Sequence, residues 1–233
     1  MMNEVYWLAG MIAPNQADDP APLSKWIAET LQKSGIKPQW VNEINLISSQ
    51  PDLDQIAVLP TDMNQIPLLR WKISTPLNHK IVQFACQSIL SGDLDMILFA
   101  EFYDQHWSIL ILGSPKTIGK YNLPPQARFL KFWTSNSPSD FLFEDPPAIF
   151  PISITETEQI GAEDIDYISG CDPREQAVTR QFPHAKMPES VLQTQSVLSQ
   201  INQFVQHSKK SKIKYGLVVS MGEPGFITLM ESI

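Results

Sequence analysis

The chain has 233 residues, a formal net charge of -8, and 43% hydrophobic and 18% charged residues, so its length permits one globular domain of ordinary core size or two small halves sharing a core. The sequence pI near 5.0 argues against a surface for nucleic acid or anionic membrane, because such surfaces need clustered Lys and Arg. Its apolar runs fall short of the roughly 20 residues that a membrane helix needs, and a cytoplasmic protein without nucleic-acid or membrane partners is expected.

The two cysteines, Cys86 and Cys171, are too few for a disulfide framework and lack the paired spacing of a structural metal site. We therefore expect neither a metal nor a cofactor. Cys86 falls inside an amphipathic helical segment, and a cysteine there is typical of a small core residue.

Hydrophobic patterning predicts an α/β alternation in the first half of the chain. Strands are expected at 5–13 and 41–48, with a helix at 22–34 between them. On this helix Leu23, Ile27 and Leu31 share one face.

A second helix is predicted at 79–90, followed by strands at 95–102 and 107–112. The apolar periodicity of this helix predicts one packed face, made of Ile81, Phe84, Ala85, Ser88 and Ile89. Both strands are apolar at nearly every position, which predicts a sheet covered by helices on each side.

The segment 113–157 differs in composition, because it is rich in both proline and aromatic residues. A flexible linker would contain few aromatics. We interpret it as an ordered, irregular connector that contains a strand near 128–134.

The pattern that begins at Ile36 restarts at Ile160. When Ile44 is paired with Ile165, the next buried strands, at Met96 and Tyr215, follow after 52 and 50 residues. This spacing predicts a pseudo-duplicated α/β domain spanning 1–233, with halves at 1–112 and 158–233 on either side of the connector.

Three strings of this sequence resemble the thiolase-like condensing enzymes, the family of β-ketoacyl synthases and thiolases. The string from Ala85 to Asp95 is similar to the helix and strand that follow the family's nucleophile. The string 162–168 resembles the phrase before the first catalytic histidine, and 216–231 resembles the closing hairpin. The resemblance implies a truncated thiolase-like fold with α/β/α/β/α layers and mixed central sheets.

The family's catalytic residues are a cysteine at a helix N-terminus and two histidines. On the resemblance, these positions correspond to Thr75, Cys171 and Gln193 in this sequence. All three depart from the pattern. The loop containing Gly222 and Gly225 could present backbone N–H groups to an acyl or oxyanion group, although a simple hairpin is the interpretation we favour.

These departures lead to three hypotheses. The first is a non-catalytic, β-ketoacyl-synthase-like subunit or scaffold in fatty-acid or polyketide-type assembly. The resemblance implies for it a homodimer or a heterodimer with an active ketosynthase, with acyl carrier protein as a further candidate partner. The second is an acyl transferase or hydrolase that uses Cys171, and the third is an unrelated α/β binding protein whose repeat is accidental.

Overall fold

The computed structural model describes residues 4–13, 23–48, 58–72, 78–103, 106–135, 148–151, 160, 162–170, 182, 184–187, 196–220 and 225–233. The chain divides into two compact units. The N-terminal unit is Val5–Gln126, and the C-terminal unit is Ala127–Ile233 together with Met1–Glu4.

The N-terminal unit alternates strands and helices. In chain order, its elements are β1 (Val5–Ile12), α1 (Leu23–Ser34), η1 (Pro38–Trp40), β2 (Glu43–Ser48), η2 (Thr61–Met63), β3 (Leu68–Lys72), α3 (Asn78–Ser91), β4 (Met96–Tyr103), β5 (His106–Gly113) and α4 (Pro115–Tyr121). The strands lie in the order β3-β2-β4-β5-β1. β2 is parallel to β3 and β4, whereas β5 is antiparallel to both β4 and β1.

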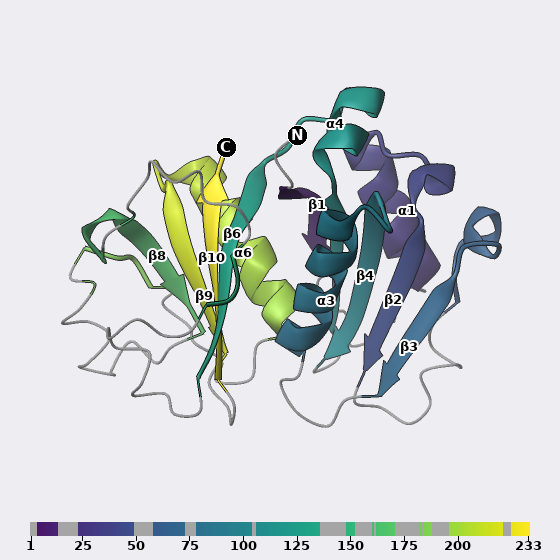
Figure 1. Ribbon diagram of the computed structural model, residues 1–233. Helices are drawn as coiled ribbons and strands as arrows, with labels where there is room; N and C mark the ends of the chain where they lie inside the picture. Colours follow the sequence, from purple (N-terminus) through teal and green to yellow (C-terminus); the bar gives the residue numbers. More distant parts are fainter. Residues whose placement is uncertain are drawn as a thin grey trace. The chain divides into compact units, whose positions relative to one another are not determined.

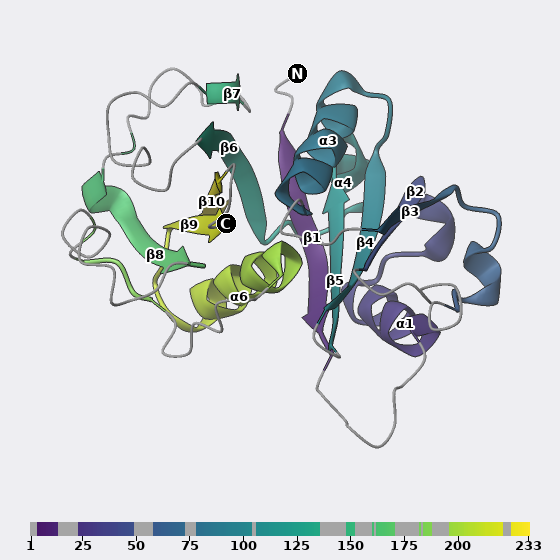
Figure 2. The ribbon, with the colours of Figure 1, turned by 90° about the horizontal axis from the view of Figure 1, so that it is seen from below.

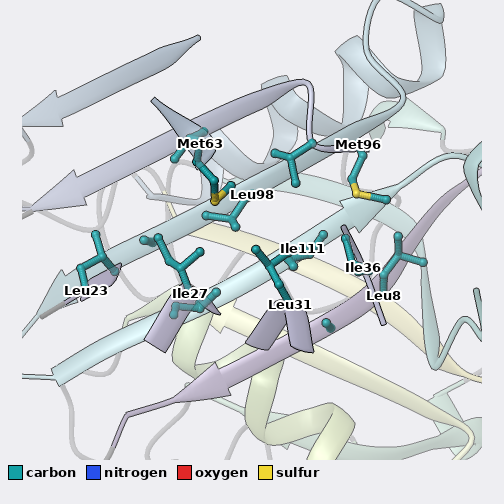
Figure 3. Packing of buried hydrophobic residues seen from close by; sticks show 14 of the residues in the cluster. Leu8, Leu23, Ile27, Leu31, Ile36, Met63, Met96, Leu98 and Ile111 are labelled. Carbon is teal, nitrogen blue, oxygen red and sulfur yellow. The ribbon is translucent and has the colours of Figure 1, made fainter. Parts of the chain in front are cut away.

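Helices α1 and α3 lie on opposite faces of this sheet (Figure 2). The α1 face carries a hydrophobic core. In it Leu23, Ile27 and Leu31 are at most 3% exposed and belong to the same cluster as Leu98 and Ile111 (Figure 3). Each fully buried leucine or isoleucine side chain contributes about 1.5–3 kcal/mol to folding. The predicted apolar face of α1 is therefore confirmed.

The C-terminal unit repeats this strand arrangement. Its elements are β6 (Ala127–Ser135), β7 (Ala148–Pro151), η4 (Ala162–Asp164), β8 (Ile165–Ser169), α6 (Val197–Lys210), β9 (Tyr215–Ser220) and β10 (Gly225–Ser232). The strands lie in the order β6-β10-β9-β8 (Figure 1). β7 pairs antiparallel with β6. β8 and β9 are parallel, whereas β10 is antiparallel to β9 and β6.

The two units therefore share one pairing pattern. In each unit two parallel strands lie side by side, β2 and β4 or β8 and β9. The second of them forms an antiparallel hairpin with the next strand of the chain, β5 or β10. The other edge of that hairpin strand pairs with the first strand of the unit, β1 or β6. The sequence repeat pairs Ile44 with Ile165 and Met96 with Tyr215. The structure places the first pair on β2 and β8 and the second on β4 and β9, which are the two parallel strands of each unit. The predicted mixed α/β fold with an internal repeat is confirmed.

Two local predictions need correction. The apolar periodicity places Phe84 on the packed face of α3, but the side chain is 60% exposed, whereas Val82 and Cys86 are buried. The buried stripe is thus rotated around the helix relative to the prediction, because a period of 3.6 residues leaves neighbouring positions hard to separate. The segment after Gly113 is not wholly irregular either, since it contains α4, which Ser114 caps by accepting a hydrogen bond from the Thr117 N–H.

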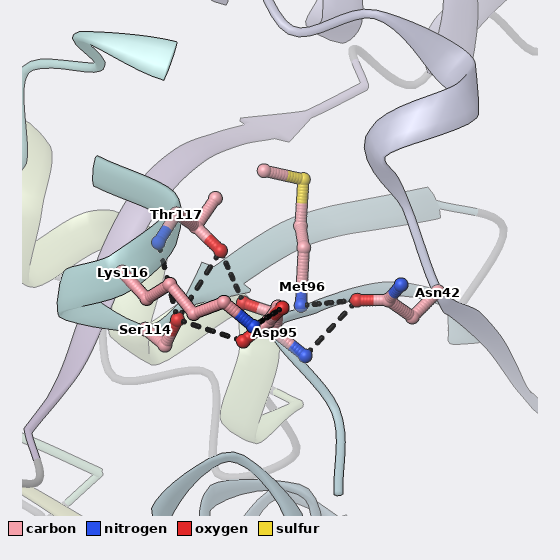
Figure 4. A network of polar contacts seen from close by, with 6 residues as sticks. All are labelled: Asn42, Asp95, Met96, Ser114, Lys116 and Thr117. Atoms are coloured by element: carbon pink, nitrogen blue, oxygen red, sulfur yellow. Dashed lines mark hydrogen bonds and ion pairs between the residues drawn. The ribbon is translucent and has the colours of Figure 1, made fainter. Parts of the chain in front are cut away.

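A polar network ties β2, β4 and α4 together at the amino ends of the parallel strands (Figure 4). Asn42 Oδ1 accepts hydrogen bonds from the backbone N–H groups of Asp95 (3.0 Å) and Met96 (2.8 Å). The Asp95 carbonyl oxygen in turn accepts from the Thr117 hydroxyl at 2.9 Å. These bonds satisfy the backbone where β4 begins.

No described helix is long and apolar enough to cross a membrane.

We expect Asn42→Ala to lower the free energy of unfolding by about 1 kcal/mol, because two backbone donors lose their shared acceptor. Asn42→Asp is the matched control, since it keeps an oxygen at the same reach and should lose less. Urea denaturation followed by circular dichroism measures both. Equal losses in the two variants would show that the shared acceptor contributes nothing measurable.

Candidate functional site

The carboxyl ends of the parallel strands are the natural place for a site in each unit. In open α/β sheets ligands bind beyond these ends, where the N-termini of the connecting helices also lie. In the N-terminal unit this edge is formed by the ends of β2 and β4 and the start of α3. In the C-terminal unit it is formed by the ends of β8 and β9 and the start of α6.

Cys86 lies within α3, more than two turns after the helix begins at Asn78. Its side chain is 1% exposed, and burial raises the pKa of the thiol. A nucleophilic cysteine needs the opposite environment, electropositive and partly exposed. Cys86 is a core residue, as the sequence indicated.

The position assigned to the family's nucleophile, Thr75, lies outside the described residues, in the segment that joins β3 to α3. The sequence of that segment, Ile-Ser-Thr-Pro-Leu, contains neither cysteine nor histidine. The start of α3 therefore has no thiol within reach along the chain.

In the C-terminal unit, β8 ends against β9 and α6 in a very close approach. Gly170 has φ +89°, and a β-carbon built on it would lie 1.8 Å from the Val219 carbonyl oxygen and 2.9 Å from Gln200 Oε1. Only glycine fits this place, because any side chain would collide with the backbone of β9. The chain is thus held tightly at the residue before Cys171.

The other predicted site residues of this unit are only partly located. Cys171, Gln193 and Gly222 lie outside the described residues. Gly225 opens β10, opposite Ser135 of β6. The hypothesis of an oxyanion loop therefore stays a prediction, and the hairpin interpretation has its second strand confirmed at β10.

No group of three or more His, Cys, Asp or Glu side chains that could hold a metal ion occurs within the described ranges. His184 is exposed. His207 is exposed as well, and its ring stacks on that of Tyr167 with centroids 5.3 Å apart. Neither of these two environments suggests a catalytic base.

Sequence reasoning missed Glu101, which is 1% exposed near the carboxyl end of β4. It pairs with Ile47 on β2 and with Ser108 on β5, and Ser108 is itself 3% exposed. A carboxyl group so deeply buried is rare, because burial penalises its charged form. The available signal was a single acidic residue within the apolar run of β4.

Comparison with solved structures identifies the architecture. The human mitochondrial 3-ketoacyl-CoA thiolase in complex with CoA matches with a TM-score of 0.70 at 12% identity, covering 100% of this chain and 98% of that chain. The Bacillus anthracis acetyl-CoA acetyltransferase matches with a TM-score of 0.70 at 10% identity, covering 100% and 99%. The chain has a thiolase-like fold. The internal repeat is therefore part of this architecture and not accidental, whereas a binding function, the other part of the third hypothesis, stays a prediction.

Sequence comparison adds no closer relative. No family model matches the chain, and no curated protein matches it. At 10–12% identity the likeness concerns the thiolase-like fold alone.

Cys86 should not react with a thiol reagent in the native protein. We expect Cys171→Ser, which retains only Cys86, to release no chromophore from Ellman's reagent until guanidinium is added, and then to release one equivalent. Cys86→Ala is the matched control and reports the native reactivity of Cys171 alone. Rapid native labelling of Cys171→Ser would contradict the buried position of Cys86.

Proposed function

We propose that this protein is a non-catalytic subunit or scaffold of acyl-thioester metabolism, similar in kind to a β-ketoacyl synthase and associated with fatty-acid or polyketide-type chain assembly. The observation that carries the proposal is the burial of Cys86 inside α3. A thiolase-like fold is retained while the thiol that the helix start would need is missing.

The physical chemistry of condensation supports the same conclusion. Carbon–carbon bond formation or thiolysis through a covalent acyl intermediate needs a thiolate and hydrogen-bond donors for the developing enolate oxygen. The sequence has no histidine at the positions of Cys171 and Gln193. Neither the nucleophile nor the imidazole donors of the family are therefore supplied by this chain.

The proposed assembly is a homodimer or a heterodimer with an active ketosynthase, and an acyl carrier protein is a further proposed partner. Strand β3 lies at the end of its unit's strand order, and its Leu69 side chain is 41% exposed. An edge strand with exposed apolar residues is a template for pairing with another chain. A monomeric mass at micromolar concentration would overturn the proposed assembly.

A second function, acyl transfer or hydrolysis through Cys171, is favoured by one observation. Gly170, the residue before Cys171 in the sequence, lies against the backbone of β9 at the end of β8. The neighbouring Asp172 and Glu175 in the sequence count against it, because nearby carboxylates disfavour a thiolate. Slow alkylation of Cys171 across pH 6–9 (roughly the range around an ordinary thiol pKa) would dispose of this alternative.

We expect the purified protein to show no thiolysis of acetoacetyl-CoA and no condensation of acetyl-CoA with malonyl thioesters above the uncatalysed rate. Product formation followed by chromatography is the measurement. Cys171→Ser is the control for the second function, since a residual activity that it abolishes would belong to Cys171. Turnover that survives in Cys171→Ser would contradict the proposal that this chain lacks a catalytic nucleophile.

A further inference from the structure

Two aromatic rings of the N-terminal unit stack on each other next to the start of β4. Trp40, which ends η1, and Tyr121, which ends α4, lie with their ring centroids 3.9 Å apart and an angle of 12° between the ring planes. Both residues are half-buried, and both pack against the core cluster of the α1 face. The core therefore fixes one side of each ring, while the rest of the ring reaches the surface.

An exposed lysine lies over each of these rings. Lys37 Nζ is 5.6 Å from the centroid of Trp40, and Lys120 Nζ is 4.9 Å from the centroid of Tyr121. Stacked rings leave no room for an ammonium group between them, so both charges lie outside the stack. Attraction to the rings restricts these otherwise flexible side chains. We call Lys37, Trp40, Lys120 and Tyr121 the aromatic-lysine surface.

The polar network of Figure 4 joins the two elements that carry this surface. Asn42, two residues after Trp40, and Thr117, one helical turn before Tyr121, both form hydrogen bonds with the backbone of Asp95. η1 and α4 are therefore connected through the start of β4 as well as through the stacked rings. A surface that is ordered in this way before a partner arrives loses less conformational entropy on binding.

The two lysines of the surface carry charge that the described part of the unit does not neutralise. Lys116, also on α4, forms an ion pair with Asp95 at 2.8 Å. By contrast, no carboxylate oxygen of a described residue lies within ion-pair distance of Lys37 or Lys120. The surface thus combines exposed ring edges with two cations that are available to an anionic partner.

We propose that the aromatic-lysine surface is a docking site for a short segment of a partner protein that contains both acidic and apolar side chains. Its carboxylates would accept hydrogen bonds from the two ammonium groups, and an apolar side chain would cover the exposed ring edges. Aromatic residues are enriched in protein interfaces. Nucleic acid fits less well, because its dense phosphates would meet the net charge of -8 of the whole chain. The inference does not depend on the proposed function.

The test measures binding of the full chain to a fluorescein-labelled peptide of glutamate and leucine residues by fluorescence anisotropy. Wild-type protein should bind this peptide, and a second peptide with glutamine in place of glutamate should bind about tenfold more weakly. The double variant Lys37→Ala/Lys120→Ala should weaken binding of the acidic peptide by about the same factor, because two charge-assisted contacts are lost. Lys210→Ala/Lys212→Ala is the matched control, since it removes two exposed lysines of the C-terminal unit and should leave binding unchanged.

Several results would overturn the inference. Equal weakening by the two double variants would show a general effect of charge, and wild-type protein that binds neither peptide, or both equally, would show that the surface does not select acidic segments. Tighter binding of a labelled oligothymidylate than of the acidic peptide would make the partner a nucleic acid. Self-association that Lys37→Ala/Lys120→Ala alone abolishes would make the occupant a second copy of this chain.

Discussion

Close approach of backbone to backbone and of helix to sheet is the constraint on which each unit depends. In the C-terminal unit, Gly216 lets the Phe204 ring of α6 lie against β9, because a β-carbon there would come within 2.4 Å of the ring. Gly170 lets β8 end directly against the Val219 carbonyl oxygen. Protein interiors are close-packed, so such contacts fix the position of α6 against its sheet.

The same close packing explains why the architecture itself does not depend on a reactive thiol. Strand pairing and helix burial in a thiolase-like fold depend on apolar volume, glycine clearance and backbone hydrogen bonds, none of which needs a reactive thiol. Cys86 illustrates this, since a small apolar side chain is all that its place in α3 requires. The repeated strand pairing is therefore a property of the fold and does not by itself identify a function.

Much of the fold could be predicted from the sequence, because long apolar periods report buried helices and strands directly. The strands at β4 and β5 and the helix α1 are examples, and the repeat that joins Ile44 with Ile165 survives as shared strand pairing. Helix α4 was missed because seven residues with a proline at the start give little periodicity. Glu101 was missed because a strand pattern shows that a polar residue is present and not whether its side chain is buried.

The most direct test of the account is the intact mass of the native assembly, purified from its own cells and measured under non-denaturing conditions. The account predicts a homodimer, or a heteromer with a larger condensing enzyme, in which this chain carries no covalent acyl group. A chain bearing an acyl mass that fragmentation places on Cys171 would contradict the central claim and make the protein an enzyme.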